Sequence, residues 1–284
     1  MSEKKETLED RLNQWLETQG YPLEMAVAAA FQRAGYRVFQ SDYYLDPESS
    51  DFRQVDVVAR CQRDIEGILV RMTFAIECKL SRDKPWILFT SPQAVLAARA
   101  SVAQRAASSI GQTLLWKLAP RAEIQDLPLL RLGNRCAYGM TQAFTSGEDV
   151  SLSASMSVAK AADARAREAT QATGVQGYFG EIIFPVIIID GKLFECYLNA
   201  DSEQMLQEVS QGVLVWRNQM VGMPHTIIHV VTLAGLDDFI AQAAHTVAAI
   251  FKGCEQEIEK LEGDQEEKGR LLAGRRSRNQ APPA

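Results

Sequence analysis

The chain has 284 residues, of which 46% are hydrophobic and 23% are charged, a balance that supports one sizeable core with a small appendage. Its formal net charge of −6 counts against avid, non-specific coating of nucleic acid, because such coating draws on a net positive surface. No apolar run approaches the roughly 18 residues of a membrane span, and the first residues lack the apolar stretch of a signal peptide, so we expect a cytoplasmic protein without a membrane partner.

The first predicted element is an amphipathic helix over residues 6–18, which Gly20 ends. Its apolar positions align on one side, namely Leu8, Leu12, Trp15 and Leu16. Two interpretations stay open for this stripe. It is either part of the core or a docking surface of a subunit in a larger complex.

A second helix is predicted over residues 22–34, because Pro22 stands in its first turn and apolar residues follow at helical spacing. Glu24 borders this apolar stripe, on the side expected to meet the sheet. It is either an acid favoured by the helix dipole or a side chain directed at a site on the sheet. Gly35 ends the helix, and a short strand is expected over residues 36–40.

Two strands with alternating apolar and polar residues are predicted next, over residues 52–60 and 69–79, with a turn at 64–67. Pairing their apolar sides decides which polar side chains meet. A four-residue turn places Asp56 opposite Ala75 and diagonal to Glu77. A three-residue loop with a glycine bulge would shift the register by one residue and separate the two acids.

In the four-residue register, the carboxylates of Asp56 and Glu77 share one face with the ammonium group of Lys79. Carboxylate oxygens are hard ligands that suit Mg2+ or Mn2+, and a neighbouring ammonium favours hydroxide and stabilises negative charge on a reacting phosphodiester. The pattern therefore predicts a metal-dependent phosphodiesterase site. The alternative is that all three residues form the solvated edge of an amphipathic pair of strands.

Four segments together resemble the PD-(D/E)xK nuclease superfamily, and within it they are most similar to Mrr-type restriction enzymes and archaeal Holliday junction resolvases. The segments are Leu23-Glu24, Ala34-Gly35-Tyr36-Arg37-Val38, Val55-Asp56-Val57-Val58 and Ile76-Glu77-Cys78-Lys79. The resemblance covers about the first 90 residues. It implies a restriction-endonuclease-like α/β fold, with a central mixed sheet flanked by helices. It also implies that Asp56 and Glu77 are metal ligands, Lys79 is the catalytic lysine and Glu24 is an auxiliary acid. Val55 stands where the family name has proline.

Beyond the hairpin, candidate nucleic-acid contacts are Lys84, Trp86, Arg131 and Arg135. Trp86 is either a stacking platform for a base or a packing residue beside the next helix. A long helix is predicted over residues 92–108, and segment 117–150, which holds both arginines, is predicted to be an irregular, loop-rich insertion.

The second half predicts extra strands and a C-terminal helix on the same sheet. Residues 182–189 form the most apolar strand, expected at the sheet centre, and Asp190-Gly191 is predicted to be a hairpin turn into residues 193–198. Further elements are a helix at 153–172, strands at 213–216 and 226–232, and a helix from residue 236. His225 and His229 are interpreted as structural, since no further metal ligand accompanies them.

We therefore expect three segments, an N-terminal helix at 1–20, a nuclease-like domain at 21–251 and a charged helical or disordered tail at 252–284. The leading hypothesis is a Mg2+-dependent DNA nuclease in genome defence or repair. The alternatives are an inactive nucleic-acid-binding module and a structural subunit. Homo-oligomerisation and a defence-complex partner stay open. The scattered cysteines predict neither disulfides nor a zinc site.

Overall fold

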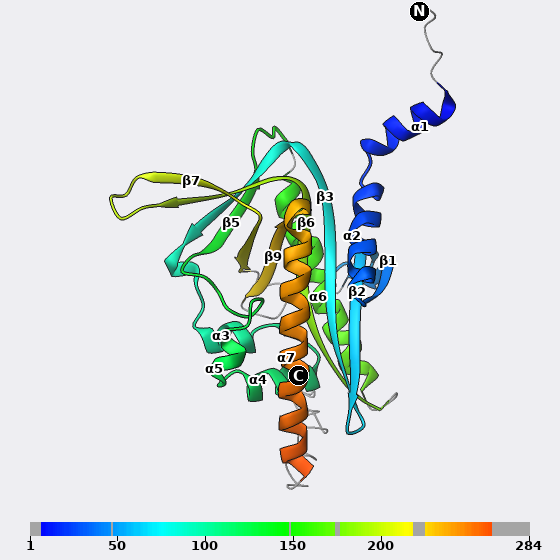
Figure 1. The fold of residues 1–284 in the computed structure, drawn as a ribbon, viewed down its shortest axis with the longest axis vertical. Coiled ribbons are helices and arrows are strands. Elements are labelled where there is room, and N and C mark those ends of the chain that lie inside the picture. The colour runs from blue at the N-terminus through cyan, green and yellow to red at the C-terminus, as the bar shows by residue number, and fades with distance from the viewer. Residues whose placement is uncertain (1–6, 47, 148, 174–176, 218–224, 263–284) are drawn as a thin grey trace, which may run out of the picture.

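The computed structural model describes residues 7–46, 48–147, 149–173, 177–217 and 225–262. Within them the chain forms a nine-stranded mixed sheet with helices on both faces (Figure 1). The strands are β1 Arg37–Leu45, β2 Phe52–Ile65, β3 Ile68–Ser91, β4 Ala106–Ala107, β5 Cys136–Gln142, β6 Tyr178–Leu198, β7 Gln204–Val209, β8 Gln211–Trp216 and β9 Thr226–Thr232. The α-helices are α1 Leu8–Glu17, α2 Tyr21–Arg33, α3 Ala98–Ala103, α4 Ser109–Leu118, α5 Ala122–Gln125, α6 Val150–Ala172 and α7 Leu236–Glu262. The predicted α/β sheet flanked by helices is confirmed.

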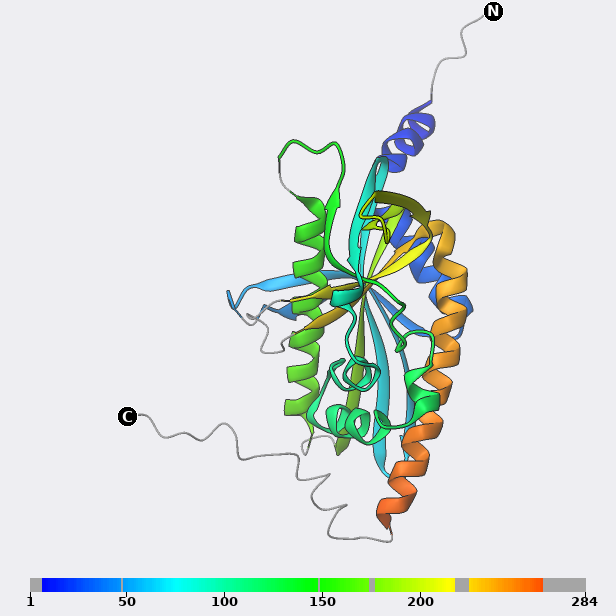
Figure 2. The same cartoon turned by 90° about the vertical axis from the view of Figure 1, so that its left-hand side faces the viewer.

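The two faces of the sheet are covered by different helices. Figure 2 shows α6 on one side of the strands and α7 on the other. Helices α2, α4 and α7 share one apolar core with alternate residues of β2, β3 and β6, and α6 packs its alanine-rich side on the opposite face. Because both faces are covered, polar side chains of the central strands under α6 are removed from bulk water.

The centre of the sheet is the parallel pair of β3 and β6, which runs from Ile68–Tyr178 to Phe89–Cys196. Strand β9 adds to β6 on its other side, so the expectation that residues 182–189 lie at the sheet centre is confirmed. The pairings β3–β5, β5–β8, β8–β9, β9–β6 and β6–β3 close a circuit. The sheet is therefore wrapped on itself at this end.

The predicted hairpin at Asp190-Gly191 is wrong, because β6 continues through both residues. A Cβ atom on Gly191 would lie 2.3 Å from the carbonyl oxygen of Ser81 on β3. The glycine thus allows two strand backbones to approach closely, which is another use of a glycine inside a strand. The actual hairpin comes later, where β6 turns at residues 199–203 into β7 and projects from the body (Figure 1).

Two predictions for residues 92–150 also need correction. The expected helix over 92–108 is replaced by a 3-10 turn at Pro92–Ala94, the short helix α3 and strand β4. The segment 117–150, expected to be irregular, contains α5 and strand β5. Strand β5 pairs with β3 and β8, so long-range pairing orders a segment whose local sequence is rich in turn residues.

The two terminal helices differ in packing. None of the residues of α1 is buried, and its apolar stripe is exposed, so the core interpretation of that stripe is wrong for the single chain. Helix α7 continues through residue 251, with Cys254 and Ile258 fully buried. Residues 263–284, which hold the rest of the predicted tail, lie outside the described residues. No helix in the described ranges is long and apolar enough to cross a membrane.

Candidate functional site

The hairpin of β2 and β3 sets the position of the predicted site. Its ladder runs from Val57–Ile76 to Ile65–Ile68, with Val58 opposite Ala75. The predicted pairing of Asp56 with Ala75 is therefore wrong by two residues. The physical reason is the turn. Glu66 and Gly67 both have positive φ, of 49° and 79°, so they make a two-residue hairpin loop in place of the predicted four-residue turn. A shift by two keeps every side chain on its predicted face.

Asp56 lies just past the end of this ladder. One oxygen of its carboxylate accepts a 2.8 Å hydrogen bond from the backbone N–H of Cys78 on β3. The side chain thereby takes the place of a strand-to-strand backbone bond and fixes Asp56 beside the Glu77–Lys79 segment. Burial raises the pKa of Asp56, and the Cys78 N–H and Lys79 oppose this effect.

Glu77 is the most enclosed of the four predicted catalytic residues, with 8% of its surface exposed. One carboxylate oxygen accepts a 2.6 Å bond from Lys79 Nζ, and the other accepts a 3.0 Å bond from the Ser157 hydroxyl on α6. Burial raises the pKa of Glu77, and repulsion by the Asp56 carboxylate adds to the rise. The two acids therefore interact across the end of the ladder.

Lys79 follows two residues later on the same face of β3 and is 27% exposed. Burial alone would lower its pKa, but attraction by Glu77 and Asp56 outweighs burial and raises the pKa above its ordinary value. Lys79 is therefore an ammonium ion at neutral pH. It carries the positive charge of the cluster.

Glu24 belongs to the first turn of α2, and the structure places it within electrostatic range of the same cluster. Burial raises its pKa first, and the charges of Asp56 and Glu77 raise it further. The α2 N-cap, Gly20, provides no side-chain cap. The backbone N–H of Glu24 donates to the Gly20 carbonyl oxygen at 3.1 Å, whereas the Glu24 carboxylate forms no hydrogen bond or ion pair with another described residue. Its side chain is therefore not held as a capping acid, and its surroundings are those of a residue at the edge of the cluster.

The donor set suits a divalent cation of the Mg2+ class. Two clustered carboxylates with raised pKa values would be relieved of mutual repulsion by such an ion, and Mg2+ is commonly held by one or two carboxylates, with water and substrate oxygens as further ligands. In the described part of the chain, no group of three or more His, Cys, Asp or Glu side chains forms a metal-binding cluster. Asp56 and Glu77 thus fit as a partial ligand set.

The four candidate nucleic-acid contacts have different environments. Trp86 is fully buried, and its indole N–H donates to the Ser81 hydroxyl at 3.0 Å, so the stacking interpretation is wrong. Trp86 is a packing residue as predicted, but it shares its core cluster with α6 and not with the helix that follows β3. Lys84 and Arg131 are exposed. Arg135 donates to Glu195 at 3.1 Å and lies 3.6 Å from the centre of the Tyr197 ring, so it is already engaged within the fold.

His229 is buried beside Arg105, whose guanidinium lies 3.1 Å from its Nε2. Burial, with a contribution from Arg105, lowers the pKa of His229 to about 3. His225 lies at hydrogen-bond distance from Gln104. Both histidines have protein partners, in agreement with the structural interpretation.

Ser157 is the residue at this cluster that sequence reasoning missed. It lies on α6, eighty positions from Glu77, and a serine in a helix rich in alanine gives no local signal of such a contact. The Tyr44 hydroxyl of β1 also reaches α6, at the Ser157 carbonyl oxygen. A comparison of the chain with protein-family models, curated proteins and solved structures gives no match. The family resemblance accordingly rests on the residues themselves.

Proposed function

We propose that this protein is a hydrolase, a divalent-metal-dependent nuclease that cleaves phosphodiester bonds of DNA in the cytoplasm, on a restriction-endonuclease-like form of its α/β fold. The observation that carries the proposal is the meeting of Asp56, Glu77 and Lys79 at the end of the β2–β3 ladder. Acids with shifted pKa values next to a lysine are typical of functional sites, where charge changes during a reaction. By the resemblance noted above, its setting is genome defence or repair.

Each residue has a distinct task in this proposal. Asp56 and Glu77 would hold Mg2+ or Mn2+, which when bound lowers the pKa of a coordinated water and offsets phosphate charge. Lys79 keeps its proton at neutral pH, so its ammonium stabilises negative charge that develops on the phosphate. The Ser157 hydroxyl orients Glu77. Glu24 serves as an auxiliary acid at the rim.

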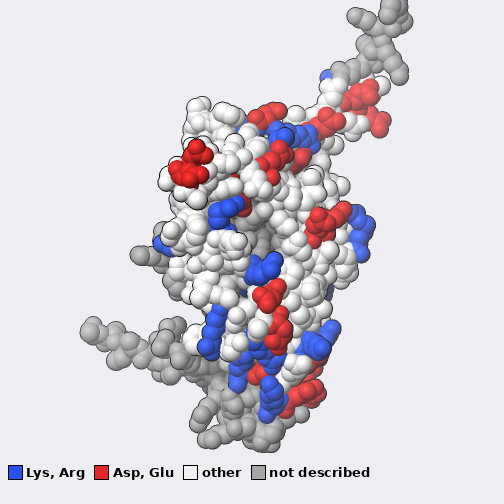
Figure 3. Space-filling view, turned by 60° about the vertical axis from the view of Figure 1, so that its left-hand side comes forward, with Lys and Arg blue, Asp and Glu red and all other residues white. Residues whose placement is uncertain are grey.

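The substrate would bind through local contacts and not through a broad basic surface. On the face shown in Figure 3, basic and acidic side chains are interspersed, in keeping with the net charge of −6. Lys84 and Arg131 are exposed and are retained as candidate phosphate contacts. Electrostatic steering toward DNA would then be weak on this face, and affinity would depend on divalent metal at the acids.

A second candidate function is a binding module or structural subunit without activity. Two observations favour it. Both Glu77 oxygens already accept hydrogen bonds from the protein, and α1 exposes a set of apolar side chains that a partner or a second copy of the chain would cover. These side chains, with their exposed fractions, are Leu8 65%, Leu12 50%, Trp15 54% and Leu16 37%.

The deciding experiment incubates the purified protein with Mg2+ or Mn2+ and linear, circular, branched and single-stranded DNA, together with matched RNA. Cleavage that requires the metal and is lost in Asp56→Asn, which keeps an acceptor for the Cys78 N–H, supports the nuclease. Glu24→Gln measures the auxiliary role, because an unchanged rate would remove Glu24 from the site. Binding of nucleic acid without cleavage of any substrate would favour the second candidate.

A further inference from the structure

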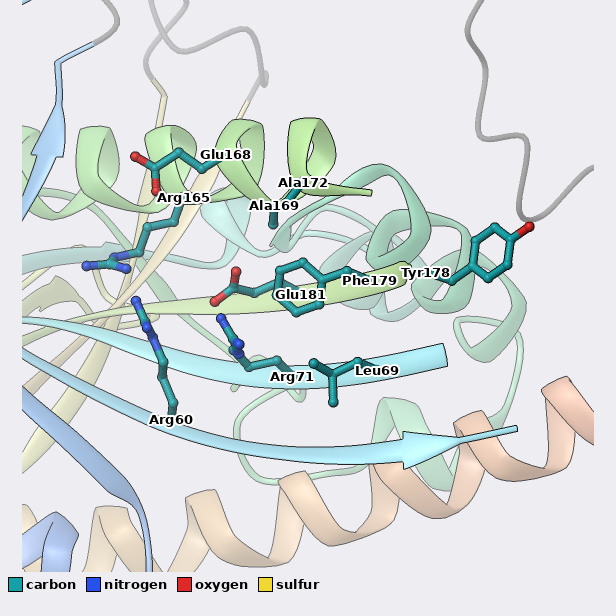
Figure 4. Close-up of a pocket in the computed structure, with 10 residues that line it drawn as sticks. All are labelled: Arg60, Leu69, Arg71, Arg165, Glu168, Ala169, Ala172, Tyr178, Phe179 and Glu181. Carbon is teal, nitrogen blue, oxygen red and sulfur yellow. The ribbon is translucent and has the colours of Figure 1, made fainter. Parts of the chain in front are cut away.

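A separate cavity lies farther along the α6 side of the sheet. It has a volume of about 260 Å³. Arg60 from β2, Arg71 from β3 and Arg165 from α6 line it, and Figure 4 shows their guanidinium groups converging between the helix and the strands. Three guanidinium groups from three elements in one small cavity form an arrangement that suits an oxyanion with several acceptor oxygens.

Two of these arginines have donors without a partner among the described residues. The side chain of Arg165 is 5% exposed and gives one N–H to Asp42 at 2.7 Å, while its buried Nε–H has no acceptor. Arg60 lies 3.5 Å from the same carboxylate, and its Nε–H is also without an acceptor. A buried donor that is left unpaired is destabilising, so an acceptor oxygen that reached either group would be favoured.

Arg71 is arranged differently. Its Nε–H donates to Gln62 at 3.1 Å, and its guanidinium lies 4.6 Å from the centre of the Phe179 ring. It forms no ion pair with another residue of the described ranges. The end of its side chain therefore remains free to bind an anion, beside an aromatic wall that suits a ring or an apolar group.

Two acids also line the cavity and limit what it accepts. Glu181 is buried and accepts a hydrogen bond from the Thr73 hydroxyl. Glu168 lies on α6, and burial raises its pKa; the charge of Arg165 opposes this rise, and the charges of Glu181 and Asp42 add to it. Neither acid forms an ion pair with the three arginines. Their negative charge opposes a large polyanion, whereas one compact oxyanion held by the arginines is compatible with it.

We propose that this cavity binds the phosphate group of a phosphomonoester, with the attached organic group against Phe179. Its volume lies just below the roughly 300–1,000 Å³ of pockets for drug-sized ligands, which suits a small ester. The ester is either a free mononucleotide-like molecule or the phosphorylated end of a nucleic acid. The cavity is distinct from the acid cluster, because Arg60 lies about 13 Å along β2 from Asp56, and Arg165 lies about 12 Å along α6 from Ser157.

The test is calorimetric titration in EDTA, with inorganic phosphate, a 5′-mononucleotide, its nucleoside, and one oligonucleotide with and without a 5′-phosphate. We expect saturable binding of phosphate and mononucleotide and at least tenfold weaker binding of the nucleoside. Arg71→Gln should weaken binding of the mononucleotide about tenfold or more, and Glu168→Gln should tighten it. Arg99→Gln, an exposed arginine elsewhere, is the matched control and should change nothing.

The oligonucleotides separate the two sources of the phosphate. If the oligonucleotide with a 5′-phosphate binds more tightly than the one without it, the cavity is assigned to nucleic-acid ends. If both oligonucleotides bind equally weakly while the mononucleotide binds tightly, the cavity is assigned to a free ester. Three results would each overturn the proposal. They are a failure of phosphate and mononucleotide to bind, equal binding of nucleoside and nucleotide, and unchanged binding of the mononucleotide by Arg71→Gln. Because the assay contains no divalent metal and no cleavage step, its outcome is independent of the proposed nuclease activity.

Discussion

Replacing Asp56 by asparagine separates a metal-binding acid from a merely structural one. The amide oxygen of asparagine can still accept the N–H of Cys78, which Asp56 binds at 2.8 Å, so the end of the ladder is kept. The exchange removes the negative charge of Asp56. Burial disfavours this charge, and its repulsion raises the pKa of Glu77. The metal-free variant should therefore be as stable as the natural protein or slightly more stable.

Bound metal should make the natural protein more stable than Asp56→Asn. At a Mg2+ concentration ten times the Kd, binding to the folded state alone adds RT ln(1 + 10), about 1.4 kcal/mol. For a protein of this size, that corresponds to a rise in Tm of roughly 2–3 °C. Asp56→Asn loses a charged ligand, so its metal-dependent gain should fall to near zero.

The assay is urea and thermal unfolding of both proteins in EDTA and in increasing Mg2+ or Mn2+. Asp51→Asn is the matched control, because Asp51 is an exposed acid next to the start of the same strand and should keep the full metal response. Equal stabilisation of the natural protein and Asp56→Asn by metal would refute the assignment of Asp56 as a ligand. Absence of any metal response in the natural protein would refute the site.

Three further outcomes are expected. Lys79→Ala should leave metal-dependent stabilisation largely intact while lowering turnover roughly 10²–10³-fold, and normal cleavage by it would contradict the assigned role. Gly191→Ala should destabilise the protein, because its Cβ would meet the Ser81 carbonyl oxygen at 2.3 Å, whereas the same exchange in an uncrowded strand would stabilise it by roughly 0.5–1 kcal/mol; unchanged or increased stability in urea unfolding would argue against the continuous β6. His229 has a folded-state pKa of about 3, below its unfolded value. Between about pH 6.5 and 3 the unfolded chain therefore binds a proton that the folded chain does not. The free energy of unfolding should fall as the pH drops through that range, by up to about 1.4 kcal/mol per pH unit. His229→Gln should lose less stability between pH 7 and 5 than the natural protein, as measured by urea midpoints.

Period-two alternation was sufficient to predict the faces of β2 and β3 but not their register. Side chains of a strand alternate strictly, so any even shift leaves Asp56, Glu77 and Lys79 together, whereas an odd shift would have separated them. The sequence did not reveal that Glu66 would adopt positive φ with Gly67. The loop length, and with it the exact partner of Asp56, therefore depended on a conformation that glutamate seldom takes.

Contacts made over long sequence separations were the least predictable. Ser157 reaches Glu77 and Arg165 reaches Asp42 only because α6 packs along the sheet, and neither residue has a local pattern that marks it. The Asp190-Gly191 pair had the local pattern of a turn, but the adjacent backbone of β3 accounts for this glycine. Local sequence patterns thus did not predict the structure at these positions, because contact with a second segment of the chain determined it.

Asp56 has two tasks in the site, and the choice of substitution depends on separating them. The regular ladder ends at Val57–Ile76, and the next buried N–H, that of Cys78, is satisfied by the Asp56 carboxylate. Alanine at position 56 would leave that N–H without its partner, at a cost of roughly 1–3 kcal/mol, and would remove the acid in the same step. A lost metal response in Asp56→Ala could then come from a distorted ladder, whereas in Asp56→Asn it can only come from the missing charge.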